Sequence, residues 1–281
     1  MRNLAGKPQL YSINTATLGY QNSIEEIIDL CAERNIGGIA PWIAEVEHKN
    51  HQALSRQLKA ANIHLSGFCR SHYYTAETSV ERKQAIVRNQ KALDIAAELN
   101  APCFVQVVGS LVGKNKNLAE ARTHVKQGIK ALLTHSKDVG VPLALEPLHP
   151  MTTADRSCLS SLNQALNWCD ELDPDGEFNL GIALDVYHVW WDEDLERLIK
   201  RAGNRILAFH VSDWLVNTCD LVSDRGMPGD GVIDIPQIRS WVEDAGYQGL
   251  VEIEIFSKNH WWQMPSPQII DSCIERISQY C

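Results

Sequence analysis

The chain has 281 residues, of which 44% are hydrophobic and 22% are charged, the balance of an ordinary globular protein. Its 26 lysines and arginines against 35 aspartates and glutamates give a formal net charge of −9, which argues against a protein that binds nucleic acid through phosphate contacts. No stretch approaches the ~18 apolar residues that a membrane-spanning helix needs, and residues 1–14 lack the apolar core of a signal peptide.

Strand-like and helix-like segments alternate through the first half of the chain. Within residues 23–31 the apolar side chains recur at helical spacing, and Ser23 with Glu26 matches a capping box. The predicted strands are residues 10–13, 37–40, 63–68 and 103–108, and the predicted helices are residues 23–31, 51–61, 80–99 and 118–139.

The second half repeats the same alternation. Its predicted strands are residues 142–146, 180–185, 206–211 and 250–255, and its predicted helices are residues 160–172, 194–202, 235–245 and 267–280. Eight strand–helix units in this length predict an α/β fold, a single (β/α)8 TIM barrel that occupies residues 1–281 as one domain. A doubly wound open sheet is the alternative, but the glycine-rich turn GxGxxG expected after its first strand is absent.

The eight cysteines are scattered and include no CxxC pair. This pattern is typical of reduced thiols rather than of a disulfide framework or a thiolate zinc site. We therefore expect a cytoplasmic protein with no membrane or nucleic-acid partner.

In each of the last four predicted strands, the last residue expected to face the barrel interior is ionisable. Alternate residues of a barrel strand face the interior, and the bulky apolar residues of these strands can all face the helices. The inward positions then end in Glu146, Asp185, His210 and Glu254. The carboxyl ends of the strands form the catalytic face of this fold, so these four side chains are expected to converge there.

Three carboxylates at one place repel one another and lose solvation unless a cation neutralises them. Oxygen ligands with one imidazole suit one divalent metal ion, with Mn²⁺ favoured and Mg²⁺, Co²⁺ or Zn²⁺ as alternatives. Each residue alone could be an ordinary polar cap, but four at the ends of four consecutive strands favour a metal site. Glu252 also faces inward, one layer deeper, and would replace Glu254 as a ligand if the strand ended two residues earlier.

The segments around these four residues resemble the xylose isomerase-like TIM-barrel sugar (phosphate) isomerase/epimerase family. They are LALEPLHP, ALDVYH, FHVSDW and VEIEIF, and the resemblance extends along the whole chain. It implies that Glu146, Asp185, His210 and Glu254 bind one divalent metal, which holds two oxygens of an open-chain sugar. It also implies that Glu146 and Glu254 are the catalytic acid–base groups on opposite faces of the substrate.

The implied reaction moves a proton beside a carbonyl group through a metal-stabilised cis-enediolate. Return of the proton to the neighbouring carbon is aldose–ketose isomerisation. Return to the other face of the same carbon is epimerisation. Two glutamates permit either outcome.

Five further residues are candidates for substrate binding. The resemblance implies that His188, three residues after Asp185, and Arg225 in the loop after the seventh strand contact substrate oxygens. His64 and Gln106 are inward candidates on strands three and four, and Trp42 follows strand two, where its ring could stack on a sugar. Each could instead be an ordinary loop or core residue.

The expected substrate is a small sugar or a polyol-derived ketone. The absence of a clustered lysine and arginine loop favours an unphosphorylated compound. Alternatives are a metal-dependent dehydratase of a keto-inositol or dehydroshikimate, an AP-endonuclease-like hydrolase and a non-catalytic sugar-binding protein. A homodimer or homotetramer is compatible with the exposed aromatic residues expected near the barrel mouth.

Overall fold

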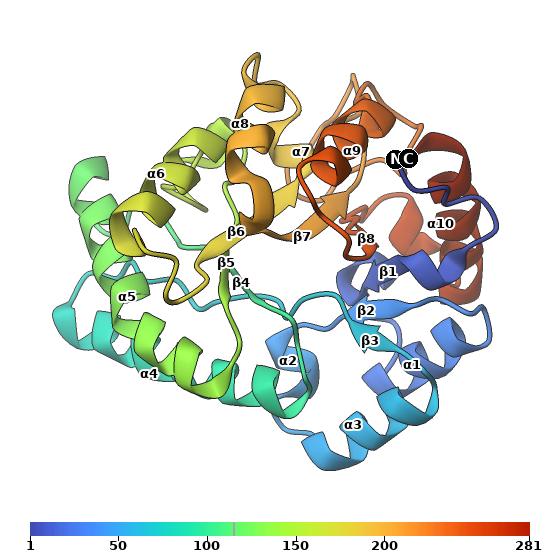
Figure 1. The fold of residues 1–281 in the computed structure, drawn as a ribbon, viewed down its shortest axis with the longest axis horizontal. Helices are drawn as coiled ribbons and strands as arrows, with labels where there is room; N and C mark the ends of the chain where they lie inside the picture. The colour runs from blue at the N-terminus through green and yellow to red at the C-terminus, as the bar shows by residue number, and fades with distance from the viewer. Residues whose placement is uncertain (115) are drawn as a thin grey trace.

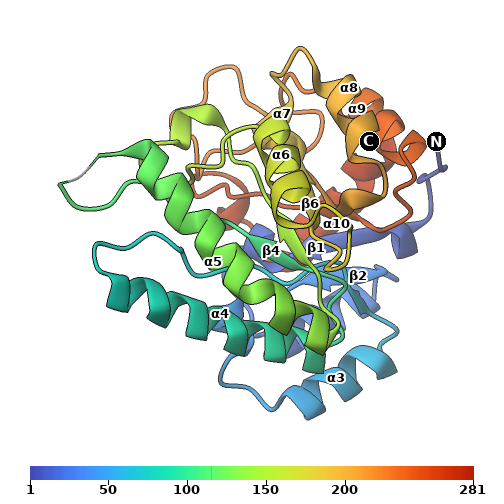
Figure 2. The same ribbon diagram turned by 60° about the vertical axis from the view of Figure 1, so that its left-hand side comes forward.

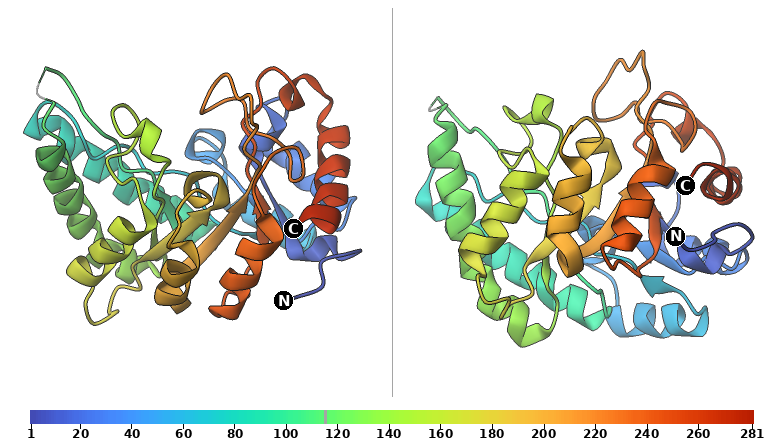
Figure 3. Two further views of the ribbon diagram at one scale, coloured as in Figure 1. Left: turned by 90° about the horizontal axis from the view of Figure 1, so that it is seen from above. Right: turned by 45° about the horizontal axis from the view of Figure 1, so that its top comes forward.

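The computed structural model describes residues 1–114 and 116–281. Eight parallel strands form one curved sheet in the order β3-β2-β1-β8-β7-β6-β5-β4, and the helices surround it (Figures 1 and 3). This arrangement confirms the predicted (β/α)8 barrel. The strands are β1 (Tyr11–Asn14), β2 (Gly38–Ala40), β3 (His64–Leu65), β4 (Phe104–Gln106), β5 (Leu143–Leu145), β6 (Gly181–Asp185), β7 (Ile206–Val211) and β8 (Val251–Ile253).

The barrel closes between β3 and β4 by a short bridge beyond the end of β3. The backbone N–H of Phe68 donates to the carbonyl of Cys103 at 3.0 Å, and the N–H of Val105 donates to the carbonyl of Phe68 at 2.9 Å. These two bonds join the outer strands of the sheet order. The ring of strands is therefore complete, although this seam is shorter than the other strand pairings.

The predicted helices form within one or two residues of their expected ends. The Ser23–Glu26 capping box at the start of α1 is present, as its sequence predicted. Helices α4 and α5 are the longest and lie side by side (Figure 2). The helices are α1 (Ile24–Ala32), α2 (Ile43–Val46), α3 (His51–Ala60), α4 (Ser79–Glu98), α5 (Leu118–Val139), α6 (Leu162–Leu172), α7 (Val186–Val189), α8 (Leu195–Ala202), α9 (Ile235–Asp244) and α10 (Ser266–Tyr280).

The four-residue helices α2 and α7 were not predicted, because one turn is too short to show a helical pattern. Within the described residues, no helix has both the length and the apolar character needed to cross a membrane.

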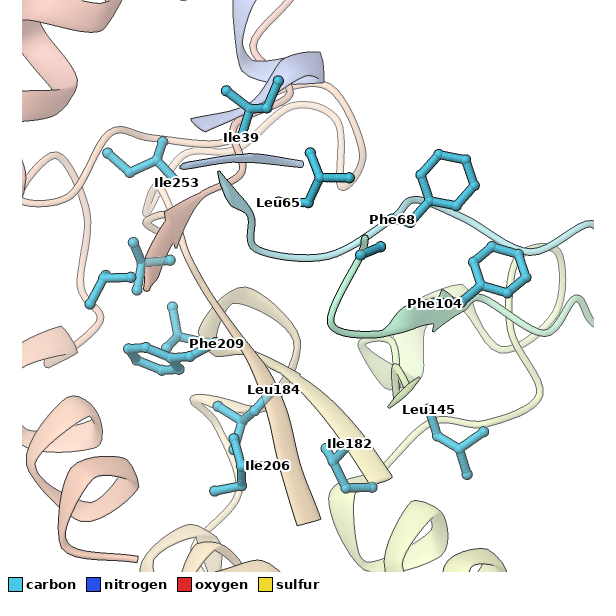
Figure 4. Packing of buried hydrophobic residues seen from close by; sticks show 14 of the residues in the cluster. Ile39, Leu65, Phe68, Phe104, Leu145, Ile182, Leu184, Ile206, Phe209 and Ile253 are labelled. Atoms are coloured by element: carbon cyan, nitrogen blue, oxygen red, sulfur yellow. The ribbon is translucent and has the colours of Figure 1, made fainter. Parts of the chain in front are cut away.

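Large and small apolar side chains are divided between the two faces of the sheet. Leu145, Leu184 and Phe209 belong to the large core between the strands and the helices (Figure 4). Ala144, Ala183 and Ala208 belong to a small cluster inside the barrel, as the alternation predicted. Since these inner residues are small, the barrel axis has room for polar side chains above them.

Leu207 departs from the predicted alternation. It was expected to face the helices, but it packs against the inner cluster. The cause is a bulge, since Ile182 pairs with Ile206 while the next residue of β6, Ala183, pairs with Ala208. The extra residue in β7 leaves both Leu207 and Ala208 facing inward. Beyond the bulge the alternation resumes and places His210 beside Asp185.

Candidate metal centre

Four ionisable side chains meet at the carboxyl ends of neighbouring strands. Asp185 is the last residue of β6 and His210 lies near the end of β7, while Glu146 and Glu254 directly follow β5 and β8. One nitrogen or oxygen atom from each lies within 4.8 Å of the corresponding atoms of the other three. All four side chains are buried. The convergence predicted from strand alternation is thus present.

The two ring nitrogens of His210 face different carboxylates. Its Nδ1 lies 3.2 Å from Glu146 Oε1 and 3.9 Å from Glu254 Oε2, within the cluster. Its Nε2 lies 3.5 Å from Glu252 Oε1 and has no hydrogen-bond partner among the described residues. Burial alone would lower the pKa of His210, but the surrounding glutamates, Glu252 first, raise it well above its ordinary value.

Glu252 lies beneath the cluster and is held by the first half of the barrel. Its carboxylate accepts hydrogen bonds from Asn14 Nδ2 at 2.9 Å and from Ser66 Oγ at 2.6 Å. Asn14 Nδ2 also donates to Glu254 Oε1 at 3.1 Å, and Asn14 Oδ1 accepts from Trp42 Nε1 at 2.7 Å. Asn14 therefore orients both glutamates. It was missed from the sequence, although its position at the end of β1 matches that of Asp185 on β6.

Arg225 reaches the same cluster from the loop after β7. Its Nη1 donates to Asp185 Oδ2 at 2.9 Å and to Glu254 Oε2 at 3.2 Å. Its Nη2 lies 3.2 Å from His188 Nε2, which is itself 3.6 Å from Asp185 Oδ2. Arg225 and His188 are both buried, so both belong to the site rather than to an exposed loop.

Backbone contacts hold the Arg225 loop in place. The neighbouring residue Gly226 forms a two-way backbone bridge with Asp213, and Arg225 N donates to the carbonyl of Phe256 at 2.9 Å. The guanidinium of Arg225 also lies over the rings of Tyr187 and Phe256, at 4.4 and 4.9 Å from their centroids. The charge of Arg225 is therefore fixed against the carboxylates.

Burial shifts the protonation equilibria of this cluster. It raises the pKa of Asp185 to about 6, despite the opposing charge of Arg225. Burial and the charge of Glu146 raise the pKa of Glu254, again against Arg225. Burial, followed by the charge of Arg225, lowers the pKa of His188 well below its ordinary value. His188 is therefore a neutral imidazole near neutral pH.

A small cavity opens above the cluster. Glu146 and Glu254 line it, whereas Asp185 and His210 lie deeper. Trp42, half-buried, forms part of its wall. The complete lining is Trp42, Cys69, Arg70, Val105, Val107, Glu146, Leu148, Arg156, His188, Arg225, Glu254 and Phe256.

Two of the predicted substrate residues lie elsewhere. His64 begins β3 at the amino end of the barrel, where its side chain is exposed, opposite the catalytic face. Gln106 faces the helices because Val105, not Gln106, is the inward residue of β4. Its Oε1 accepts a hydrogen bond from the Tyr74 hydroxyl, and its Nε2 donates to the carbonyl of Phe104 at 2.9 Å. Both predictions were wrong.

The donor set fits a divalent cation. With Glu252 included, four buried carboxylates face the charge of Arg225 and the imidazole of His210. Such an excess of buried negative charge is costly without a cation, and oxygen ligands with one imidazole suit a divalent metal. Among the residues that the structure describes, this is the one group of histidine, cysteine, aspartate and glutamate side chains arranged to hold a metal.

Replacing Glu252 with glutamine should mainly lower stability. The amide loses the negative charge that Asn14, Ser66 and His210 now face, and it must turn its NH₂ group toward one of these groups. We expect a loss of about 1–3 kcal/mol in the free energy of unfolding. Chemical denaturation of both proteins measures this difference, and an unchanged midpoint would contradict it.

The chain belongs to the xylose isomerase-like TIM barrel family, whose model matches residues 20–280. An inosose isomerase of Halalkalibacterium halodurans is 27% identical over 210 residues, 70% of each chain. Protein SMc04130 from Sinorhizobium meliloti 1021 is 46% identical over 98% of this chain and 99% of its own, with a TM-score of 0.93. The IOLI protein with a binding zinc atom has the same fold at 18% identity, with a TM-score of 0.81 over 96% and 99% of the two chains.

These relationships confirm the family that the four motifs predicted. The similarity to an inosose isomerase agrees with the predicted class of enzyme.

Proposed function

We propose that this protein is a divalent-metal-dependent sugar isomerase or epimerase that moves a proton beside a carbonyl group. The observation that carries the proposal is the cluster of Glu146, Asp185, His210 and Glu254 beneath a cavity that both glutamates line. A buried site with two carboxylates at the cavity wall provides one group to remove a proton from carbon and another to return it.

Glu146, Asp185, His210 and Glu254 would hold the metal ion, with Mn²⁺ favoured and Mg²⁺, Co²⁺ or Zn²⁺ as alternatives. The mixed oxygen and nitrogen donors support this assignment, as does the zinc atom in the similar barrel of the IOLI protein. When bound, the cation would polarise the substrate carbonyl and stabilise the negative charge that develops beside it.

Glu254 and Glu146 would transfer the proton. Because burial raises the pKa of Glu254, this carboxylate can both accept and return a proton closer to neutral pH than an exposed glutamate. Arg225, fixed against Asp185 and Glu254, would contact a substrate oxygen together with the neutral His188. The rings of Trp42 and Phe256 line the cavity and would exclude water from the transfer.

The substrate class is a small sugar or a polyol-derived ketone. Support comes from the inosose isomerase relative, whose name gives a ketone of a cyclic polyol as its substrate. The described residues contain one cluster of potential metal ligands, which supports binding of one cation. An AP-endonuclease-like hydrolase would use several metal ions, so this cluster favours the isomerase or epimerase.

Exchange with solvent deuterium tests the proposal. We expect the Mn²⁺-loaded protein, incubated in D₂O with aldoses, ketoses and inososes, to place one deuterium on a carbon beside the carbonyl. Mass spectrometry detects the label, and the product separates isomerisation from epimerisation. Glu254→Gln is the matched control and should incorporate deuterium more slowly, by about a hundredfold or more. Loss of water would instead identify a dehydratase, and no change in any compound despite bound metal would contradict the proposal.

A further inference from the structure

Three arginines from separate parts of the chain line the same cavity. Arg70 follows β3, Arg156 follows the short 3-10 turn Pro150–Thr152, and Arg225 follows β7. Arg225 is paired with Asp185 and Glu254. Arg70 and Arg156 form no ion pair with any residue that the structure describes. Two guanidinium groups at the cavity wall are therefore free of direct ion pairs with the described residues. The charge of Arg156 does act on Asp220, whose pKa is lowered first by backbone hydrogen bonds and then, more weakly, by this arginine.

Arg70 is held in position without a charge partner. Its guanidinium lies 4.6 Å from the ring centroid of Tyr73 and 5.8 Å from that of Trp42. Its Nη1 donates to the carbonyl of Ser71 at 3.2 Å, while its Nε is buried without a hydrogen-bond partner among the described residues. Aromatic contacts fix the plane of the group and leave donors free, an arrangement suited to a bidentate anion.

Arg156 lies on a segment that is anchored at several points. Its backbone N–H donates to the carbonyl of Thr152 at 3.0 Å, and two residues later Cys158 N donates to the carbonyl of Gly109 at 2.9 Å. The Arg156 side chain is half-buried and makes no hydrogen bond within the described part of the chain. After burial and Arg225, its charge also lowers the pKa of His188, which agrees with its position beside the site.

We propose that the substrate carries an anionic group, a carboxylate or a phosphate monoester, which Arg70 and Arg156 bind while the carbonyl end reaches Glu146 and Glu254. This inference rests on the proposed isomerase or epimerase activity and adds its substrate class. Carboxylate and phosphate oxygens match the donors of two guanidinium groups that form no direct ion pair, and charge-assisted hydrogen bonds to them are stronger than those to the hydroxyl groups of a neutral sugar. The preference for an unphosphorylated compound is therefore revised, because the fold gathers arginines that are far apart in the sequence.

Paired substrates provide the first test. Each neutral ketose is compared with the corresponding uronate-derived ketose and the corresponding ketose phosphate, using deuterium incorporation to obtain kcat/KM. We expect kcat/KM for one of the two anionic compounds to exceed kcat/KM for the neutral ketose by tenfold or more. Comparison of the uronate-derived ketose with the ketose phosphate shows which anion is bound. A neutral sugar that is converted as efficiently as both anionic forms would overturn the inference.

Charge-neutral variants provide the second test. Arg70→Gln and Arg156→Gln should each lower kcat/KM for the anionic substrate by about tenfold to a hundredfold, and by a larger factor than for the neutral analogue. Arg70→Lys and Arg156→Lys should retain part of the preference. Arg56→Gln, on the exposed face of α3, is the matched control and should change neither value. Equal losses for neutral and anionic compounds in the Gln variants would contradict the proposal.

Binding of an unreactive anion separates this inference from the proposed function. Calorimetry with gluconate and with inorganic phosphate should show binding to the wild-type protein that weakens in the Arg70→Gln Arg156→Gln double variant. If such binding is present while no compound exchanges deuterium, the proposed activity fails and the anion site stands. If exchange occurs but neither anion binds in an arginine-dependent way, the activity stands and the anion site fails.

Discussion

Replacement of Glu254 by glutamine is expected to lower kcat by about 10²–10⁴-fold, the usual contribution of a positioned acid–base group. The amide has nearly the shape of the carboxylate and can still accept a hydrogen bond from Asn14. It cannot take a proton from carbon, and it is a poorer ligand for a divalent cation. Steady-state kinetics with saturating Mn²⁺, together with the metal content of the purified variant, measure the two effects.

Glu252→Gln is the control for this substitution, because Glu252 lies two residues away on the same face but one layer deeper. It should retain much more turnover than Glu254→Gln while losing stability. The reverse result, loss of metal and turnover in Glu252→Gln with an active Glu254→Gln, would show that Glu252 is the ligand from β8.

Removal of the metal is expected to abolish deuterium exchange and to lower Tm. Without a cation, the buried carboxylates of Glu146, Asp185 and Glu254 repel one another with only Arg225 and His210 beside them. A cation at a hundred times its Kd would stabilise the fold by about 2.7 kcal/mol. Scanning calorimetry of chelator-treated protein, with Mn²⁺, Mg²⁺, Co²⁺ or Zn²⁺ added back, measures the gain and ranks the metals.

Asp185→Asn is the matched variant for that experiment, since its side chain keeps its place on β6 but loses its charge. We expect its Tm to respond less to added cation than that of the wild-type protein. Full exchange activity after complete chelation would contradict the metal requirement.

The cluster could be predicted from the sequence because β5 to β8 alternate sharply between bulky apolar and small or ionisable residues. Ala183 and Asp185 could be read as inward because Leu184 between them is bulky and apolar. The same rule fails on β4, where Phe104, Val105 and Gln106 are all buried and no contrast shows which side faces the axis. Gln106 was therefore assigned to the wrong face.

Position along a strand was the second source of error. His64 lies on the inward-facing register of β3 but at its amino end, and alternation alone does not report depth along the barrel axis. The bulge at Leu207 could not be predicted either. The extra residue of β7 is apolar like its neighbours, so nothing in the amino-acid sequence marks the shift in register.

Residues that reach the cavity from loops could not be identified as cavity residues from the amino-acid sequence one at a time. Arg70 and Arg156 are separated by 86 positions in the chain and come together only because the loops after β3 and β5 share one end of the barrel. Arg225 was found through the family resemblance, which implies a substrate-binding arginine in the loop after the seventh strand. The network of Asn14 and Ser66 around Glu252 depends on strands from opposite ends of the sequence.

All four residues of the candidate metal centre come from β5 to β8, whereas Trp42 and Arg70, in the cavity wall, follow β2 and β3. Part of the cavity wall therefore comes from loops that supply no metal ligand. During evolution, mutations in the loops after β2 and β3 can alter which compound is accepted while the proton-transfer residues stay unchanged. A barrel in which some wall loops are independent of the metal ligands is well suited to give rise, after gene duplication, to enzymes that share one reaction and differ in substrate.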